Sequence, residues 1–217
     1  AGGESTAATA RSVETDGTGD YLATPSSTDF DMGTGDFTVE GWFKVNIANN
    51  SFGANNNFGF FMNSSSLQQG GTAVDYYGVH IYRSPSGIGF RAGSADQNTG
   101  IQPPFGQWFH IALVRNSGTT SLYYNGVLAK SASDSTDYTE TNNKFILGGY
   151  ANTNYLMNGS ISNFRVVKGT AVYTSSFRPT TEPLTSISGT VLLCCNNSST
   201  TGSTTGGTLT AYGDPTA

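Results

Sequence analysis

The chain alternates between apolar and polar residues over short stretches, which is the pattern of β-strands. In Phe37–Val45 every second residue is apolar or glycine and the residues between them are mostly polar, so this segment predicts a strand with two distinct faces. Comparable patterns predict further strands at Phe58–Met62, Val74–Tyr82, Gly87–Arg91, Gln107–Arg115, Ser121–Lys130, Lys144–Gly148, Tyr155–Val167, Thr190–Cys195 and Thr208–Tyr212. No segment keeps the 3.6-residue period of an amphipathic helix over three turns, so the sequence predicts an all-β protein.

Turn signals separate the predicted strands at regular intervals. Asn125-Gly126 lies between two apolar runs, and this dipeptide supplies the two positive-φ residues that a type I′ hairpin requires. Other turns are predicted at Ser84–Gly87 and Asn116–Thr120, and the Asn-rich segment Asn46–Asn57 predicts a loop. Turns that recur about every 8–12 residues are typical of sandwiches, so we expect a two-sheet antiparallel jelly-roll sandwich.

The composition agrees with this fold class and excludes several others. Aromatic residues make up 12% of the 217 residues and charged residues another 12%, which excludes intrinsic disorder and suits pleated sheets. The formal net charge is −5 and the 10 Lys and Arg residues are scattered singly, so we expect no binding to nucleic acid or to anionic membranes. No apolar run approaches the roughly 18 residues of a membrane-spanning helix.

The length suits a single domain with a polar segment at each end. Residues 1–12 are small and polar and predict a flexible N-terminal arm. Residues 13–195 predict the jelly roll, and residues 196–217 predict a polar C-terminal tail that contains a last strand. We expect the arm and the tail to become ordered when the protein docks onto neighbouring subunits.

Three blocks of the sequence, in order along the chain, resemble a known family. They are DGTGDYLATPSSTDFDMGTGDFTVEGWF, GQWFHIALVRNSGTTSLYYNGVLAKS and NGSISNFRVVKGTAVYTSSFRPTTEPLTSISGTVLLC. They are similar to the concanavalin A-like, laminin-G or pentraxin-type jelly roll, in the version found in structural proteins of tailed phages, especially those of cyanobacteria. The resemblance implies two packed antiparallel sheets and functions that range over sugar binding, adhesion and virion architecture.

An acidic turn near the start of the jelly roll is a candidate calcium site. Asp16 and Asp20 lie four residues apart with glycines between them, and calcium requires oxygen ligands on a chain that can bend around the ion. In the family that the chain resembles, an ion sometimes bridges this block and the turn that starts at Asn158. The alternative is a tight hydrogen-bonded turn without an ion, since Asp and Gly are ordinary turn residues.

Tyrosine and asparagine residues in the loops are candidates for a carbohydrate-binding surface. The candidates for binding a sugar or a partner are Tyr76, Tyr77, Tyr150, Tyr155, Asn152 and Asn154. Tyrosine rings stack on the apolar faces of sugars, and amides pair with sugar hydroxyls. The alternative is an ordinary set of edge and loop residues, because Tyr is common at sheet edges and Asn in loops.

The sequence gives no candidate for catalysis. The five Glu residues are far apart in the sequence, whereas β-glucanases of this fold carry their two catalytic carboxylates on one short strand. Glu40 is interpreted as a strand residue with a structural hydrogen bond, and His80 and His110 lack a partner at metal-ligand spacing. Cys194 and Cys195 are adjacent on a predicted strand, so their side chains are expected on opposite faces.

These observations lead to three functional hypotheses. The first is a non-enzymatic decoration protein on the capsid of a tailed phage, bound to the major capsid protein, to other virion proteins or to copies of itself; its basis is the resemblance and the short chain, which ends about 22 residues after the resembling blocks. The second is a tail or fibre protein that recognises host surface glycans. The third is an extracellular carbohydrate-binding or adhesion module. No cofactor is expected apart from a structural calcium ion.

Overall fold

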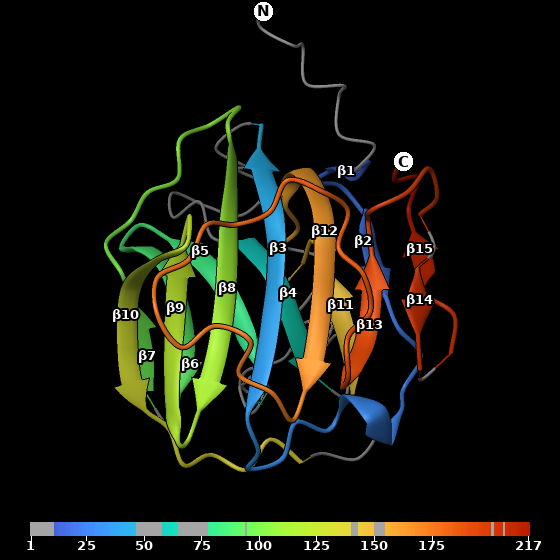
Figure 1. Cartoon of the computed structure of the whole chain (residues 1–217). Helices are drawn as coiled ribbons and strands as arrows, with labels where there is room; N and C mark the ends of the chain where they lie inside the picture. The colour runs from blue at the N-terminus through green and yellow to red at the C-terminus, as the bar shows by residue number, and fades with distance from the viewer. Residues whose placement is uncertain are drawn as a thin grey trace, which may run out of the picture.

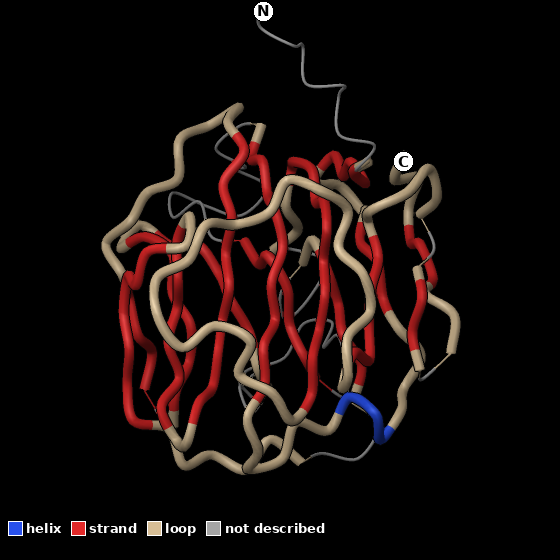
Figure 2. The backbone as a smooth tube through the Cα atoms, in the orientation of Figure 1, coloured by secondary structure: helices blue, strands red, loops and turns tan. Residues whose placement is uncertain are grey.

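The computed structural model describes residues 11–46, 58–64, 78–93, 95–139, 143–149, 155–200, 202–205 and 207–217. In these residues the chain forms β-strands and a single turn of 3-10 helix, Thr28–Phe30 (Figure 2). None of the helical structure described has the length and apolar character needed to cross a membrane. The prediction of an all-β protein with two antiparallel sheets is confirmed.

The first sheet, in front in Figure 1, has the strand order β10-β9-β8-β3-β12-β13-β14, and β1 also pairs with β12. Its strands are β1 (Ser12–Asp16), β3 (Phe37–Val45), β8 (Trp108–Asn116), β9 (Thr119–Tyr124), β10 (Val127–Ser133), β12 (Asn158–Lys168), β13 (Thr190–Cys194) and β14 (Ser203–Thr204). We call it the front sheet. Its central strand β3 pairs along its whole length with β8, from Phe37 opposite Arg115 to Lys44 opposite Trp108.

The second sheet lies behind the first and has the order β15-β2-β11-β4-β5-β6-β7. Its strands are β2 (Tyr21–Ala23), β4 (Phe58–Ser64), β5 (His80–Ser84), β6 (Gly87–Ala92), β7 (Ala95–Asn98), β11 (Lys144–Leu147) and β15 (Thr210–Tyr212). We call it the back sheet. Since β15 pairs with β2, the C-terminal residues close the back sheet beside one of its first strands.

The core between the two sheets is built around phenylalanine rings. Phe43 of β3 packs edge-on against Phe60 of β4 and Phe164 of β12, with ring centroids 5.1 and 6.5 Å apart. All three rings are fully buried, and burying one such ring contributes about 1.5–3 kcal/mol to stability. The alternation predicted for Phe37–Val45 therefore places its apolar residues between the sheets.

The hairpin prediction is confirmed, and some strands were not predicted. Asn125 and Gly126 both have positive φ, 50° and 78°, and they join β9 to β10 as expected of a type I′ turn. The pattern analysis missed β7 and β14, and it assigned Ser12, the first residue of β1, to the flexible arm although Ser12 pairs with Ser162. These strands are short and polar. Residues 74–77 of the strand expected at Val74–Tyr82 lie outside the described residues.

The expectation that Cys194 and Cys195 point to opposite faces is wrong. β13 ends at Cys194, and Cys195 has a φ of 59°, so the backbone is no longer extended there. This left-handed residue brings the two sulfur atoms to 3.6 Å, and both side chains are buried. The rule that neighbouring side chains alternate holds only within a strand.

A long irregular segment, residues 169–189, connects β12 to β13 and crosses the outer face of the front sheet (Figure 1). We call it the strap. It leaves β12 beside Asp36, reaches the β9–β10 turn, where the Phe177 N–H donates to the Gly126 carbonyl, and then returns toward β13. The strap therefore covers part of a sheet face that would otherwise be exposed.

Candidate functional site

A buried polar network holds the strap against the front sheet. Glu40 of β3 points outward from the sheet, and its Oε1 accepts a hydrogen bond from Arg165 Nε of β12 at 3.0 Å. Its Oε2 accepts one from the Tyr173 hydroxyl of the strap at 2.8 Å and lies 3.4 Å from His110 Nε2 of β8. The other end of Arg165 donates from Nη1 to the Thr185 carbonyl, so the network ties both halves of the strap to the sheet.

The titration of these groups follows from their surroundings. Burial is the largest influence on Glu40 and acts to raise its pKa, but the His110 hydrogen bond and the Arg165 charge outweigh it and hold the pKa below the usual value of 4.5. Burial and the Glu40 charge raise the pKa of the Tyr173 hydroxyl. Glu40 is therefore an ionised structural group, which agrees with its interpretation as a strand residue with a hydrogen bond.

Aromatic packing completes the attachment of the strap. The Tyr173 and Phe177 rings lie parallel with centroids 3.6 Å apart, and Phe177 also meets Tyr123 of β9 edge-on at 5.7 Å. Beneath them are Ala112 and Val114 of β8, which are buried on the outer face of the front sheet. Sequence reasoning missed the strap because irregular segments show no hydrophobic period.

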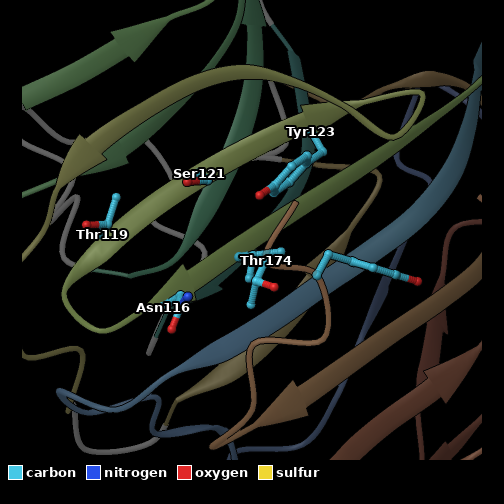
Figure 3. A pocket seen from close by; sticks show the side chains of 7 residues that line it. Asn116, Thr119, Ser121, Tyr123 and Thr174 are labelled. Carbon is cyan, nitrogen blue, oxygen red and sulfur yellow. The ribbon is translucent and has the colours of Figure 1, made fainter. Parts of the chain in front are cut away.

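A hollow of about 170 Å³ lies where the strap meets β8 and β9. It is lined by Val114 and Asn116 of β8, by Thr119, Ser121 and Tyr123 of β9, and by Tyr173 and Thr174 of the strap. Figure 3 shows Tyr123 reaching from β9 toward Thr174. Hydroxyl groups, one amide and tyrosine rings thus surround the same space, and none of the lining residues is charged. We call this hollow the strap pocket.

The predicted calcium residues meet at the edge of the back sheet, together with a residue that the sequence did not single out. Ligand oxygens of Asp16, Asp20 and Asp214 all lie within 4.8 Å of one another, and we call this group the acidic cluster. Asn158 stands beside it, since its Nδ2 donates to the Asp16 carbonyl at 2.8 Å. The structure therefore brings Asp16, Asp20 and Asn158 together, as the spacing and the resemblance led us to expect.

The carboxylates of the cluster already accept backbone hydrogen bonds. Asp20 is buried, and its two oxygens accept the N–H groups of Asp16 and Asp214 at 3.1 and 2.8 Å. Asp16 Oδ1 accepts the Thr18 N–H at 2.6 Å. These bonds are those of the tight turn that was the alternative interpretation. An ionised carboxylate has about four lone-pair sites, so the bonds leave room for a cation as well.

Two tyrosines stack next to the acidic cluster. Tyr21 of β2 and Tyr212 of β15 are register partners, and their rings lie 4.5 Å apart with an angle of 6° between them. Tyr212 is 44% exposed. The sequence contained both residues, but their stacking depends on the pairing of two strands at opposite ends of the chain.

Most of the tyrosine and asparagine residues proposed for sugar binding lie outside the described residues. These are Tyr76, Tyr77, Tyr150, Asn152 and Asn154. Tyr155 is described and is half-buried, and its carbonyl accepts the Gly59 N–H of β4 at 3.1 Å. The tyrosines that the structure does place around a hollow, Tyr123 and Tyr173, come from a different part of the molecule.

The fold is shared with several solved structures at low sequence identity. The chain is similar to a pentraxin from Limulus polyphemus (TM-score 0.55, 13% identity, 94% of this chain and 95% of that one). It is also similar to a putative carbohydrate binding protein from Bacteroides ovatus (0.62, 12%, 96% and 62%). Domain 4 of an extracellular arabinanase from Geobacillus stearothermophilus, solved in complex with arabinotriose, matches with a TM-score of 0.50 at 19% identity over 73% and 71% of the two chains.

A sequence comparison gives the family. No curated protein matches the chain at a significant level. One family model, described as the concanavalin A-like lectin/glucanases superfamily, matches residues 16–172, which include the acidic turn, the central strands of both sheets and the start of the strap. Because the match covers most of the chain, the protein belongs to the concanavalin A-like lectin/glucanases superfamily.

Proposed function

We propose that this protein is a non-enzymatic carbohydrate-binding module that takes a sugar residue in the strap pocket. The observation that carries the proposal is the lining of that pocket, where Ser121, Thr119, Thr174 and Asn116 offer hydroxyl and amide groups beside two tyrosines. Sugars need both kinds of contact, because their hydroxyls pair with polar groups while their C–H faces pack on aromatic rings.

The lack of charge in the pocket lining favours a neutral glycan. A carboxylate or sulfate on the sugar would lose its hydration there without meeting a cation, which is costly. Two proteins of the same fold support a link to sugars by their descriptions, the putative carbohydrate binding protein of Bacteroides ovatus and the arabinanase domain solved with arabinotriose. The identities of 12% and 19% extend this support to the fold and not to individual residues.

Binding without hydrolysis is supported by the positions of the carboxylates. Retaining and inverting glycosidases use two carboxyl groups on either side of the scissile bond. No lining residue of the strap pocket is acidic, and Glu40, which lies under the strap, is buried and paired with Arg165. In the acidic cluster, both oxygens of Asp20 are occupied by backbone N–H groups.

The proposal is tested by screening the protein against a glycan array and then measuring affinities for the best ligand by calorimetry. Tyr123→Phe, Ser121→Ala and Thr174→Ala each remove one hydroxyl from the pocket, and we expect each to weaken binding about 3- to 10-fold, the value of one neutral hydrogen bond. Thr210→Ala on exposed β15 is the matched control and should bind like the wild type. Glycan binding that none of the three pocket variants changes would move the site elsewhere, and no binding to any glycan would reject the function.

The expected place on a phage capsid stays a prediction, together with the capsid or virion partners, self-association and virion location that follow from it. Purified capsids of the source phage, mixed with the protein and sedimented, would retain it at a fixed stoichiometry if the prediction is right. A glycan affinity in the strap pocket would favour the tail or extracellular alternatives instead.

A further inference from the structure

The cysteine pair at the end of β13 has a geometry that neighbouring residues in a strand do not have. The sulfur atoms of Cys194 and Cys195 are 3.6 Å apart, and Cys195 points its S–H at Cys194 Sγ. The cause is the φ of 59° at Cys195, which turns its side chain to the side of its neighbour. In an extended backbone the two side chains would lie on opposite faces of the sheet.

Long-range contacts hold this turn in place. The Cys195 carbonyl accepts the N–H of Asn163 at 2.9 Å, and Asn163, in the irregular part of β12, also has a positive φ of 50°. Gly202 packs directly on Cys194, because a Cβ at position 202 would collide with the Cys194 Cβ. The approach of the two sulfurs is therefore fixed by the fold on three sides and does not depend on a free rotation of either side chain.

We propose that Cys194 and Cys195 are an oxidation site at which a peroxide joins the two sulfurs into a disulfide between neighbouring residues. A disulfide bond is about 2.05 Å long, so the sulfurs must approach by about 1.5 Å from their present 3.6 Å. Rotation about the two Cα–Cβ bonds moves a sulfur over such a distance. Two buried thiols already in contact need no large backbone movement to find each other.

The chemistry balances with one peroxide molecule. The Cys195 sulfur attacks one peroxide oxygen, the O–O bond breaks, and the leaving hydroxide takes the thiol proton to become water, which leaves a sulfenic acid. The Cys194 sulfur then attacks Cys195 Sγ, the S–S bond forms as the S–O bond breaks, and the Cys194 proton leaves with the hydroxide as a second water. The two thiols lose two electrons and the peroxide gains them.

The order of these two steps agrees with the surroundings of the sulfurs. Burial, followed by the neighbouring thiol, raises the pKa of the Cys194 thiol, which therefore stays protonated and reacts second. Neighbouring Cα atoms are about 3.8 Å apart, closer than the 4.4–6.8 Å usual for disulfides. We therefore expect a bond that thiol reductants open readily.

Oxidation at this site would stiffen one attachment of the strap. Asn196 follows the pair directly, and its Nδ2 donates to the Leu184 carbonyl of the strap at 3.2 Å. A disulfide ring at residues 194 and 195 fixes the turn from which Asn196 extends. The site thus links an oxidising surrounding to the segment that covers the front sheet.

The test treats the folded protein with hydrogen peroxide, unfolds it in the presence of N-ethylmaleimide, and measures the mass of the peptide that contains both cysteines. We expect two maleimide adducts before oxidation and none afterwards, with a peptide lighter by two hydrogen atoms. Dithiothreitol should restore both adducts. Using this peptide separates the cysteines from oxidation of the three methionines.

Cys195→Ser is the matched variant, because its single thiol can gain oxygen atoms but cannot lose two hydrogens to a partner. The proposal is overturned if the wild-type peptide keeps both thiols after the treatment, if it gains oxygen atoms at both sulfurs, or if it appears as a disulfide between two chains. Since the measurement is made on the wild-type protein, it stands even if the variant does not fold.

Discussion

Arg165 Nε lies 3.0 Å from Glu40 Oε1, and this pair is buried under the strap between two neighbouring strands of the front sheet. Removing one member of a buried pair leaves the other charge without compensation, which costs about 3–5 kcal/mol. We therefore expect Glu40→Gln to lower the free energy of unfolding by about 3 kcal/mol or more, as measured by urea denaturation at pH 7.

The matched control for this variant is the exposed ion pair between Arg91 and Asp96, whose atoms lie 3.2 Å apart. Asp96→Asn should change the unfolding free energy by less than about 1 kcal/mol, because exposed pairs contribute little. Equal effects of Glu40→Gln and Asp96→Asn would show that the buried network does not hold the strap. The pKa of Glu40 lies below its usual 4.5, so its contribution is complete above that pH and is lost as the pH falls through the folded-state value.

His80 gives a second pH dependence, at less acidic values. It is fully buried on β5, and burial lowers its pKa from 6.5 to about 4, although the Gly78 carbonyl 2.8 Å from Nδ1 acts in the opposite direction. Since the unfolded chain binds a proton on this residue at a higher pH than the folded chain, stability is complete above pH 6.5 and falls between 6.5 and about 4.

The expected loss over this range is roughly 3 kcal/mol. It is measured by urea denaturation of the wild type and of His80→Asn at several pH values between 7 and 4. The difference in unfolding free energy between the two proteins should shrink as the pH falls, because only the wild type carries the buried imidazole. Parallel curves for the two proteins would contradict the assignment.

The sequence predicted the elements whose signals are local. The period of two residues in Phe37–Val45 marks a strand buried on one face, and Asn125-Gly126 marks a turn because few other residues adopt positive φ. β7 and β14 carry no such period, since they are short polar strands near the edges of their sheets. Their existence depends on the strands beside them, which no local pattern describes.

The same limit explains what was found and missed at the candidate sites. Asp16 and Asp20 are four residues apart and were recognised by spacing, whereas Asp214 joins them from 194 residues after Asp20. The strap pocket depends on Tyr173 crossing from the end of β12 to β9, a path that irregular sequence does not encode in any period. Cys195 was misplaced because one left-handed residue overrides the alternation of a strand.

Calcium removal tests the acidic cluster. If Asp16, Asp20 and Asp214 hold a calcium ion, saturating calcium should stabilise the folded chain by about 3 kcal/mol at a hundredfold excess over the dissociation constant. For a chain of this size that corresponds to a rise of several degrees in the melting temperature, which EDTA should reverse.

Asp214→Asn should abolish the response to calcium, and Asp29→Asn, which lies outside the cluster, should keep it. Both proteins are measured by differential scanning fluorimetry with calcium and with EDTA. A melting temperature that is indifferent to calcium and to EDTA would establish the alternative, a hydrogen-bonded turn without an ion.

Two glycines of the same backbone conformation separate the strain of a side chain from its collision with the strap. Gly126 and Gly106 have φ values of 78° and 72°, so alanine at either position costs about 1–2 kcal/mol. At Gly126 a Cβ would also collide with the Phe177 carbonyl oxygen of the strap, whereas at Gly106 no described atom lies within 4 Å of it. Gly126→Ala should therefore destabilise the protein more than Gly106→Ala, by about 1–3 kcal/mol in urea denaturation.

The excess should come from displacement of the strap and loss of the bond between the Phe177 N–H and the Gly126 carbonyl. Chymotrypsin reports this directly, because cleavage after Tyr173 or Phe177 requires the strap to leave the sheet. Gly126→Ala should be cleaved there faster than Gly106→Ala and should bind glycans more weakly, since Tyr173 and Thr174 form one side of the strap pocket. Equal stability and equal cleavage of the two variants would mean that the strap is not anchored at the β9–β10 turn.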